Sequence, residues 1–479
     1  MNSKIFLSSL VAALALGGCA IGPDYTKPEI PTPPTFRGYD QNLSQETKTG
    51  VDSKWWRGYG DERLTKAVEE ALAASYDIKI ASSQVDALLG QFDEAKSYLY
   101  PHINGSGSLT RQGVENSTNS NLKNGVTNTY AATLSMASYE IDLFGKVRRA
   151  TEAARAMLLS GEYNRRAVNL SIAASTANAY FAVSSIEAQI AAAQDNLKAS
   201  EEIEKISRIK YQNGSIGETE WLQSTAASAA ARASLASLMG QKASAEATLN
   251  NLMGRNPQRV ESSPIDSIAV VKVSAGAPSE LLLRRPDVGG AEQNLIAANA
   301  KIGVARGAYF PSISLTGMLG NQSNELNKLF SSPTRIWQIA PAINIPIFSA
   351  GYIAGQVKEA EAGREQALAQ YKKTVVAAFN DADSAIGQNY YAKEQYVFGK
   401  QREDAMKKAF EQAKLRYEVG SISYTDMLTI QQNYLSARQQ AIIAKQAALS
   451  SGVALYKALG GGWDDKNLPD LPSFFPAGR

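Results

Sequence analysis

One short motif occurs twice in this chain of 479 residues. The sequence from Tyr211, Tyr-Gln-Asn-Gly-Ser-Ile, returns from Tyr417 as Tyr-Glu-Val-Gly-Ser-Ile, at a spacing of 417 − 211 = 206 residues. An acidic residue, Glu220 or Asp426, follows each glycine by six positions. Matches that fall on turn-forming residues in the same order indicate a structural repeat. We therefore expect one continuous body built from two copies of one unit.

The match continues upstream with small changes of offset. Tyr100-Pro101 recurs as Phe310-Pro311, and the segment from Ile141 to Phe144 recurs as Ile345 to Phe348. The offset changes only where loops are expected. The repeat thus covers most of the chain.

The N-terminus reads as a secretory signal. Lys4 precedes an apolar run from Ile5 to Leu16, which ends in the small residues before Cys19. A membrane anchor is the alternative, but the run is shorter than the roughly 20 apolar residues that span a bilayer. Cys19 is the only cysteine, so it cannot form an internal disulfide, and the pattern is similar to a bacterial lipobox in which this residue is acylated. Ala20 in the next position resembles the outer-membrane sorting pattern.

Four segments have the two-residue period of strands. Residues 101–144 and 311–348 each predict a β-hairpin around a polar loop, the second loop over residues 321–334. The face preference switches near Ala137, which predicts a bulge, and Pro341 and Pro346 weaken the prediction of the last strand. The alternation suits a wall between lipid and water, or equally a half-buried sheet on a soluble core. In lipid, four strands leave open edges, so other copies of the chain would have to close the sheet.

Long helices follow each hairpin. The segments before Tyr211 and Tyr417 lack proline, and each predicts a helix about 100 Å long at 1.5 Å per residue. Gly214 and Gly420 would turn each helix back on itself, toward Gly254 and the glycines at 460–462. Asp61 to Leu99 predicts a further helix.

Composition excludes several classes of function. The net charge of +3 and the dispersed basic residues argue against nucleic acid as a partner. His102 is the only histidine, so no histidine-based metal cluster and no Ser-His or Cys-His catalytic pair can form. We expect no enzyme activity and no cofactor beyond the covalent lipid on Cys19.

In their order, these landmarks resemble the outer-membrane efflux factors, the OprM and TolC type of exit duct. The resemblance runs from Cys19 to about Trp463 and includes Tyr139 to Gly145, Pro278 to Asp287, and Phe310 to Gly317. It implies a mainly α-helical fold with a transmembrane β-segment: a homotrimer with a 12-stranded barrel and a barrel of helical hairpins. It also implies a passive duct of a tripartite pump in the outer membrane of a Gram-negative bacterium. The implied partners are a periplasmic adaptor and an inner-membrane pump of the resistance-nodulation-division class. The alternative is a lipid-anchored periplasmic coiled-coil stalk or adhesin that conducts nothing.

The resemblance places a periplasmic gate at the hairpin tips. Glu220 and Asp426 match family positions that carry acids near the closed end, although Ser215 with Glu218, and Ser423 with Asp426, also have the spacing of helix caps. We expect four cations before the glycines, together with Tyr417, to link neighbouring hairpins and hold the mouth shut: Arg208, Lys210, Lys414 and Arg416. Thr429 and Ile422 occupy positions where members of the resembled family carry further gate residues. The contacts that close the aperture would therefore be arranged differently in this chain.

These expectations divide the chain into consecutive parts. They are a signal peptide (1–18), a lipidated tether (19–55), a first repeat (56–255, with the hairpins 101–144 and 145–255), a linker (256–280), a second repeat (281–463, with the hairpins 311–348 and 349–460) and a tail (464–479).

Overall fold

A computed structural model describes residues 20–33, 36, 53–114, 125–271, 273, 284–331 and 333–461. Cys19 and the tail 464–479 lie outside these residues. The chain divides into two compact units. One, the sheet unit, comprises residues 20–29, 84–161 and 290–372; the other, the hairpin unit, comprises the described parts of 30–83, 162–289 and 373–461.

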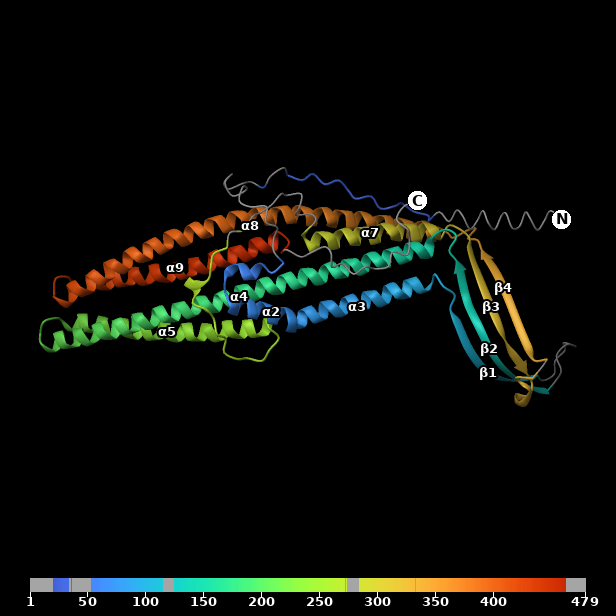
Figure 1. Cartoon of the computed structure of the whole chain (residues 1–479), viewed down its shortest axis with the longest axis horizontal. Coiled ribbons are helices and arrows are strands. Elements are labelled where there is room, and N and C mark those ends of the chain that lie inside the picture. The colour runs from blue at the N-terminus through green and yellow to red at the C-terminus, as the bar shows by residue number, and fades with distance from the viewer. Residues whose placement is uncertain are drawn as a thin grey trace. The chain divides into compact units, whose positions relative to one another are not determined.

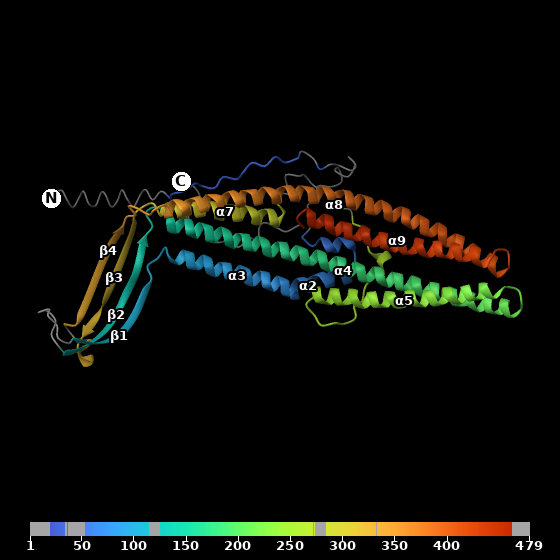
Figure 2. The ribbon, with the colours of Figure 1, turned by 180° about the vertical axis from the view of Figure 1, so that it is seen from behind.

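The sheet unit contains one antiparallel sheet of four strands. β1 (Ile103–Val114), β2 (Gly125–Ile141), β3 (Ser312–Ser323) and β4 (Arg335–Asn344) lie in the order β1-β2-β3-β4, as Figure 1 and, from behind, Figure 2 show. β2 pairs with β3, so strands from the two halves of the sequence meet in the middle of the sheet. β1 and β4 form its two edges.

Irregularities in the sheet occur near the predicted positions. The register of β2 against β3 shifts between Met136 and Tyr139, which confirms the bulge expected near Ala137. Pro341 lies inside β4 opposite Leu315, and an edge strand tolerates it because one side of its backbone has no partner strand. The predicted loop 321–334 is too long, because β3 continues to Ser323.

Each of the four strands is joined to a helix. α3 (Tyr76–Ser97) leads into β1, and α7 (Pro286–Gly307) leads into β3. α4 (Lys146–Gln212) follows β2, and α8 (Tyr352–Glu418) follows β4. The predicted helix 61–99 is wrong as one piece, because α2 (Glu62–Ala74) ends at Ser75 before α3 begins.

The segment from residue 20 to 29 packs on this unit in extended form. Asn299 Nδ2 donates to Pro23 O at 2.7 Å, and Arg149 forms an ion pair with Asp24 at 2.6 Å. Lys27 forms another ion pair with Glu292 at 2.8 Å. The beginning of the expected tether is therefore bound along α4 and α7.

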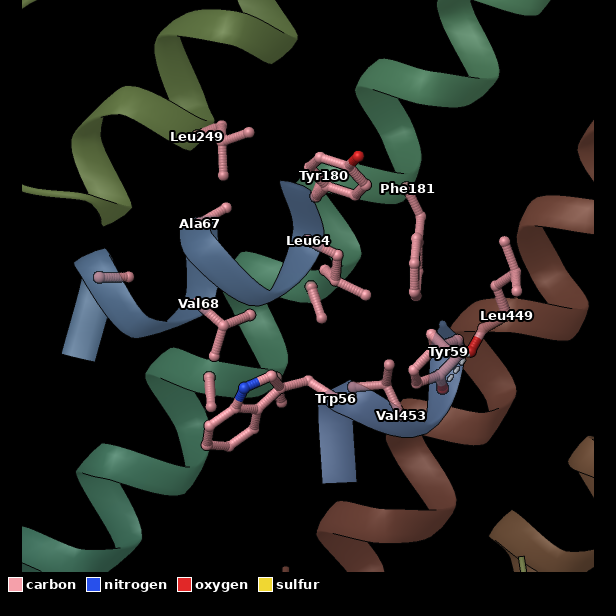
Figure 3. Close-up of a cluster of buried hydrophobic side chains, with 14 of the residues drawn as sticks. Trp56, Tyr59, Leu64, Ala67, Val68, Tyr180, Phe181, Leu249, Leu449 and Val453 are labelled. Carbon is pink, nitrogen blue, oxygen red and sulfur yellow. Dashed lines mark hydrogen bonds between the residues drawn. The ribbon is translucent and has the colours of Figure 1, made fainter. Parts of the chain in front are cut away.

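The hairpin unit is built around an aromatic core (Figure 3). The short helix η1 (Trp55–Tyr59) and α2 insert between α4, α5 (Glu218–Leu252) and α9 (Tyr424–Ala458). Tyr59 is fully buried and donates to Leu449 O at 3.0 Å. Asp61 caps α2 by accepting from Arg63 N and also accepts from Tyr180 Oη at 2.8 Å. These bonds satisfy the buried hydroxyl groups of Tyr59 and Tyr180 inside the core.

The long helices of the two halves have equal lengths. α4 and α8 each have 67 residues, and α5 and α9 each have 35. A 67-residue helix is about 100 Å long at 1.5 Å per residue. α9 ends at Ala458, where Gly460 and Gly461 have φ of 92° and 68°. The glycines act as the predicted helix stop.

Candidate functional site at the hairpin tips

Two turns of the same geometry reverse the chain after α4 and α8. Gly214 and Gly420 have φ of 68° and 75°, a region where glycine has no steric cost. Paired backbone bonds of 2.8 to 3.1 Å close each turn: Gly214 to Tyr211 O, Ser215 to Lys210 O, Gly420 to Tyr417 O and Ser421 to Arg416 O. This pattern is the Schellman motif, which satisfies the last carbonyls of each helix.

The returning helices begin differently. Gly217 precedes α5, and no side chain caps that helix, so the expected cap of Ser215 with Glu218 is wrong. Ser423 Oγ accepts from Asp426 N at 3.1 Å and donates to Asp426 Oδ2 at 2.8 Å. The cap expected at the second tip is therefore confirmed. Gly217 lacks the side-chain oxygen that such a cap requires.

Tyr417 stands at the centre of a hydrogen-bonded cluster between α4 and α8. Its ring is 3% exposed, and its hydroxyl lies 3.0 Å from Ser207 Oγ and 3.5 Å from Glu220 Oε1. Lys210 Nζ donates to Tyr417 O at 3.1 Å and lies 4.2 Å from the centre of its ring. Burial raises the pKa of the Tyr417 hydroxyl, and the Glu220 carboxylate adds to the effect. The two tips are thus joined within one chain.

An apolar cluster, here called the tip core, surrounds this tyrosine. Tyr424 packs on Tyr417 with ring centres 5.7 Å apart, and burial raises the pKa of Tyr424 to about 12. Ile422, which replaces a gate residue of the resembled family, packs against the same cluster. The buried members of the tip core are Ile203, Ala413, Tyr417, Tyr424 and Met427.

The first tip has another aromatic arrangement. Tyr211, the counterpart of Tyr417, stacks on Trp221 of its own hairpin, with ring centres 5.2 Å apart and planes 8° apart. Tyr211 is partly exposed, in contrast to buried Tyr417. Equivalent tyrosines of the two repeats therefore have different surroundings.

The four predicted cations also differ in their contacts. Lys414 pairs with Glu202 of α4 at 3.0 Å, whereas Arg208 reaches only Glu204 of its own helix, at 3.9 Å. Arg416 is exposed, and its side chain has no hydrogen bond or ion pair among the described residues. Of these four cations, Lys210 and Lys414 contact the other hairpin of the same chain, whereas Arg208 and Arg416 do not among the described residues.

The two carboxylates predicted to form the gate have separate partners. Glu220 is partly buried beside Tyr417, while Asp426 is exposed and bonded to its own cap residue. No hydrogen bond joins them in the described structure.

The sequence did not indicate three contributors to the cluster. Ser207, Glu202 and Tyr424 interrupt the 206-residue correspondence, since their counterparts are Ala413, Lys408 and Glu218. Helical periodicity could not link Tyr417 with Tyr424, because the chain reverses at Gly420 between them.

Among the described residues, no three histidine, cysteine or acidic side chains form a group that could hold a metal ion. His102 lies far along the chain from the tips, exposed, with Nε2 3.2 Å from Ser97 O. Of the helices described, none is long and apolar enough to cross a membrane.

Comparison with known proteins identifies the family. The model of the family described as outer membrane efflux protein matches residues 67–255 and again 277–461. The chain belongs to this family. It is 33% identical to the probable efflux pump outer membrane protein TtgC of Pseudomonas putida, over 96% of each chain. It is 30% identical to the probable outer membrane lipoprotein SilC of Salmonella typhimurium, over 96% of this chain and 99% of SilC.

The fold agrees with a solved structure of the family. The open-state outer membrane channel MtrE of Neisseria gonorrhoeae is 32% identical, with a TM-score of 0.84 over 93% of this chain and 98% of MtrE. The resemblance inferred from sequence is therefore confirmed, and the chain is an outer membrane efflux protein, mainly helical with a small antiparallel sheet. Family members are named as channels and efflux proteins rather than as enzymes. The comparisons give no support to a stalk or adhesin.

Proposed function

We propose that three copies of this chain form the exit duct of a tripartite efflux pump, through which substrates pass without chemical change. One observation carries the proposal. Leu134, Leu319 and Trp337 lie side by side across β2, β3 and β4, and each is more than half exposed. The neighbouring row on the other face is more polar and contains Ser135, Met318 and Gln338. An exposed apolar row on one face of an open sheet fits a wall against lipid.

The two edges of that sheet support a trimer. β1 and β4 each lack a neighbour on one side, and an unpaired strand edge in lipid costs several kcal/mol for each unsatisfied backbone group. Pairing of β4 with β1 of the next copy removes both edges. Three sheets of four strands then make a barrel of 12 strands. The double match of the family model and the equal helix lengths support the two-fold internal repeat on which this arrangement rests.

The tips would form the gate of this duct. Three chains bring six carboxylates, from Glu220 and Asp426, to one aperture. Two unit charges about 8 Å apart repel by about 2 kcal/mol at an effective dielectric of 20, so the ring favours cations and resists closure. Links through Lys210, Lys414, Arg208, Arg416 and Tyr417 oppose that repulsion. Exposed ion pairs are worth less than about 1 kcal/mol each, which suits a gate that opens reversibly.

The remaining assignments follow from the family. A periplasmic adaptor would grip the hairpin tips and connect the duct to an inner-membrane pump of the resistance-nodulation-division class. Acyl groups on Cys19 would anchor each chain, in keeping with the description of SilC as a lipoprotein. The domain boundaries given above remain our proposal for the division of the chain.

Conductance in planar bilayers tests the duct and its gate. Replacing Glu220 and Asp426 together with alanine should raise the closed-state leak and reduce the preference for cations. Glu218→Ala is the matched control, because it removes an exposed acid from the first turn of α5 without touching Tyr417. Purified chains that form no pores would refute the duct. Pores with unchanged leak and selectivity in the double variant would refute only the gate.

A further inference from the structure

The two strand pairs end in matching apolar segments. β2 is followed by Leu143 and Phe144, and β4 is followed by Ile347 and Phe348. A glycine with positive φ, Gly145 or Gly351, then precedes the next helix. The two halves therefore present the same aromatic residue at the same junction of sheet and helix.

The first of these aromatics has a partner within the chain. Phe144 packs on Phe310, with ring centres 4.8 Å apart. Phe310 begins the approach to β3, and Ile141 at the end of β2 is paired with Ile313. Beneath this contact Gly307 approaches α4 closely, since a Cβ there would lie 3.1 Å from Lys146 Cβ. The contact thus fastens the end of one strand pair to the beginning of the next.

The second aromatic has no such contact inside the chain. Phe348 is 88% exposed and Ile347 is 93% exposed. The counterpart of Phe310 is Tyr100, which is 48% exposed and leads into β1. Phe348 and Tyr100 thus flank opposite edges of the sheet, because β4 and β1 are its outermost strands.

We propose that Phe348 packs against Tyr100 of the partner subunit and repeats the contact of Phe144 with Phe310. The proposal rests on the trimeric duct and specifies how its subunits join. The repeat also fixes the register of the seam: Ile345, the counterpart of Ile141, lies opposite Ile103 of the partner subunit, the counterpart of Ile313. Ile345 and Ile103 are 58% and 70% exposed in the single chain.

A second copy is the occupant that these observations favour. The surface that Phe348 needs exists on every chain, at the other edge of the same sheet, so the contact is heterologous and can close a ring. Burial of an aromatic pair contributes beyond its area when the rings pack edge to face or offset. Phe348 in the lipid interface, as part of an aromatic belt, is the competing arrangement.

Cross-linking between cysteines tests the contact. The chain has one native cysteine, Cys19, so the variant Phe348→Cys with Tyr100→Cys places a defined pair of thiols in outer membranes. A short bismaleimide is the probe, because packed rings leave their Cβ atoms farther apart than a disulfide allows. We expect a ladder of covalent dimers and trimers on denaturing gels, and none for either single variant.

The first repeat supplies the matched control. Phe144→Cys with Phe310→Cys should react equally well but within one chain, so the free thiols disappear without a ladder. If the double variant of the seam fails to assemble, coexpression of a Phe348→Cys chain with a Tyr100→Cys chain leaves half of the rings in place, and covalent dimers are then expected.

The outcomes separate this contact from the duct itself. Trimers that conduct but yield no ladder, or a ladder equal to that of the single variants, would overturn the contact, favour Phe348 in lipid and leave the proposed function intact. Chains that remain monomeric and form no pore would overturn both.

Discussion

The two hairpin tips begin from nearly the same sequence and differ in what surrounds it. Both turn through a Schellman motif at glycine. Tyr417 of the second tip is buried against the first hairpin, whereas Tyr211 of the first tip stacks on Trp221 of its own hairpin. Lys210 reaches across to Tyr417, but its counterpart Arg416 is exposed. Within one chain the second tip has the first hairpin as its neighbour, while in the proposed trimer the equivalent neighbour of the first tip would come from another subunit.

The largest difference between the two tips is expected when Tyr417 and Tyr211 are each replaced by alanine. Tyr417→Ala empties a buried site in the tip core and should destabilise it by about 3 to 5 kcal/mol, as aromatic truncations in cores do. Tyr211→Ala loses one partly exposed stacked pair, worth about 0.5 to 1.5 kcal/mol. Hydrogen exchange of the amides at 413–428 measures the local opening. Equal losses of protection in both variants would contradict the comparison.

The second largest effect is expected from alkaline pH, which should destabilise the second hairpin tip. Burial raises the pKa of Tyr424 to about 12 from 10, so the unfolded tip loses this proton first. The stability from burying the neutral hydroxyl is therefore complete below pH 10 and lost as the pH rises through about 12. Absorbance of tyrosinate should reveal a late-titrating group in the native protein. Because burial raises the pKa of other tyrosines as well, Tyr424→Phe should reduce the late-titrating absorbance by one tyrosine, and an unchanged titration curve would refute the assignment.

Substitutions of the counterpart cations Lys210 and Arg416 should distinguish contacts within one chain from contacts between chains. Lys210→Met removes a charged donor and a cation over a ring, and should weaken protection at the second tip by about 1 to 2 kcal/mol. Arg416→Met should leave that exchange unchanged, because its side chain is exposed and has no hydrogen bond or ion pair with the described residues of the single chain. In the trimer it should raise the leak across bilayers. An equal effect of both variants on exchange would remove the distinction.

The helix caps should give the smallest difference. Ser423→Ala removes the hydroxyl that accepts from Asp426 N, at a cost of about 1 kcal/mol. Ser215→Ala should be close to neutral, since α5 begins after Gly217 without a side-chain cap. Exchange rates in the first turns of α9 and α5 report both. Comparable losses at the two helices would show that the cap does not distinguish the tips.

Much of the fold was predictable because its signals are local. The bulge near Ala137, the turns at Gly214 and Gly420 and the stop at Gly460 follow from strand period or from the backbone freedom of glycine. The break at Ser75 was missed, because the helical pattern continues across it and the core packing of α2 ends the helix. Pro341 argued against a strand that does form. The sequence could not show that β4 lies at an edge of the sheet, where proline is tolerated.

The sequence by itself determined the helix and strand order and the family, because each depends on residue types at fixed spacing along the chain. Only the tertiary structure decided which tyrosine is buried and which cation crosses between hairpins. It also decided which aromatic, Phe144 or Phe348, finds its partner inside the chain. The physical reason is that two hairpins of equal helix lengths joined in one chain have one shared face and two outer faces, and a local sequence pattern does not specify which face a residue will occupy.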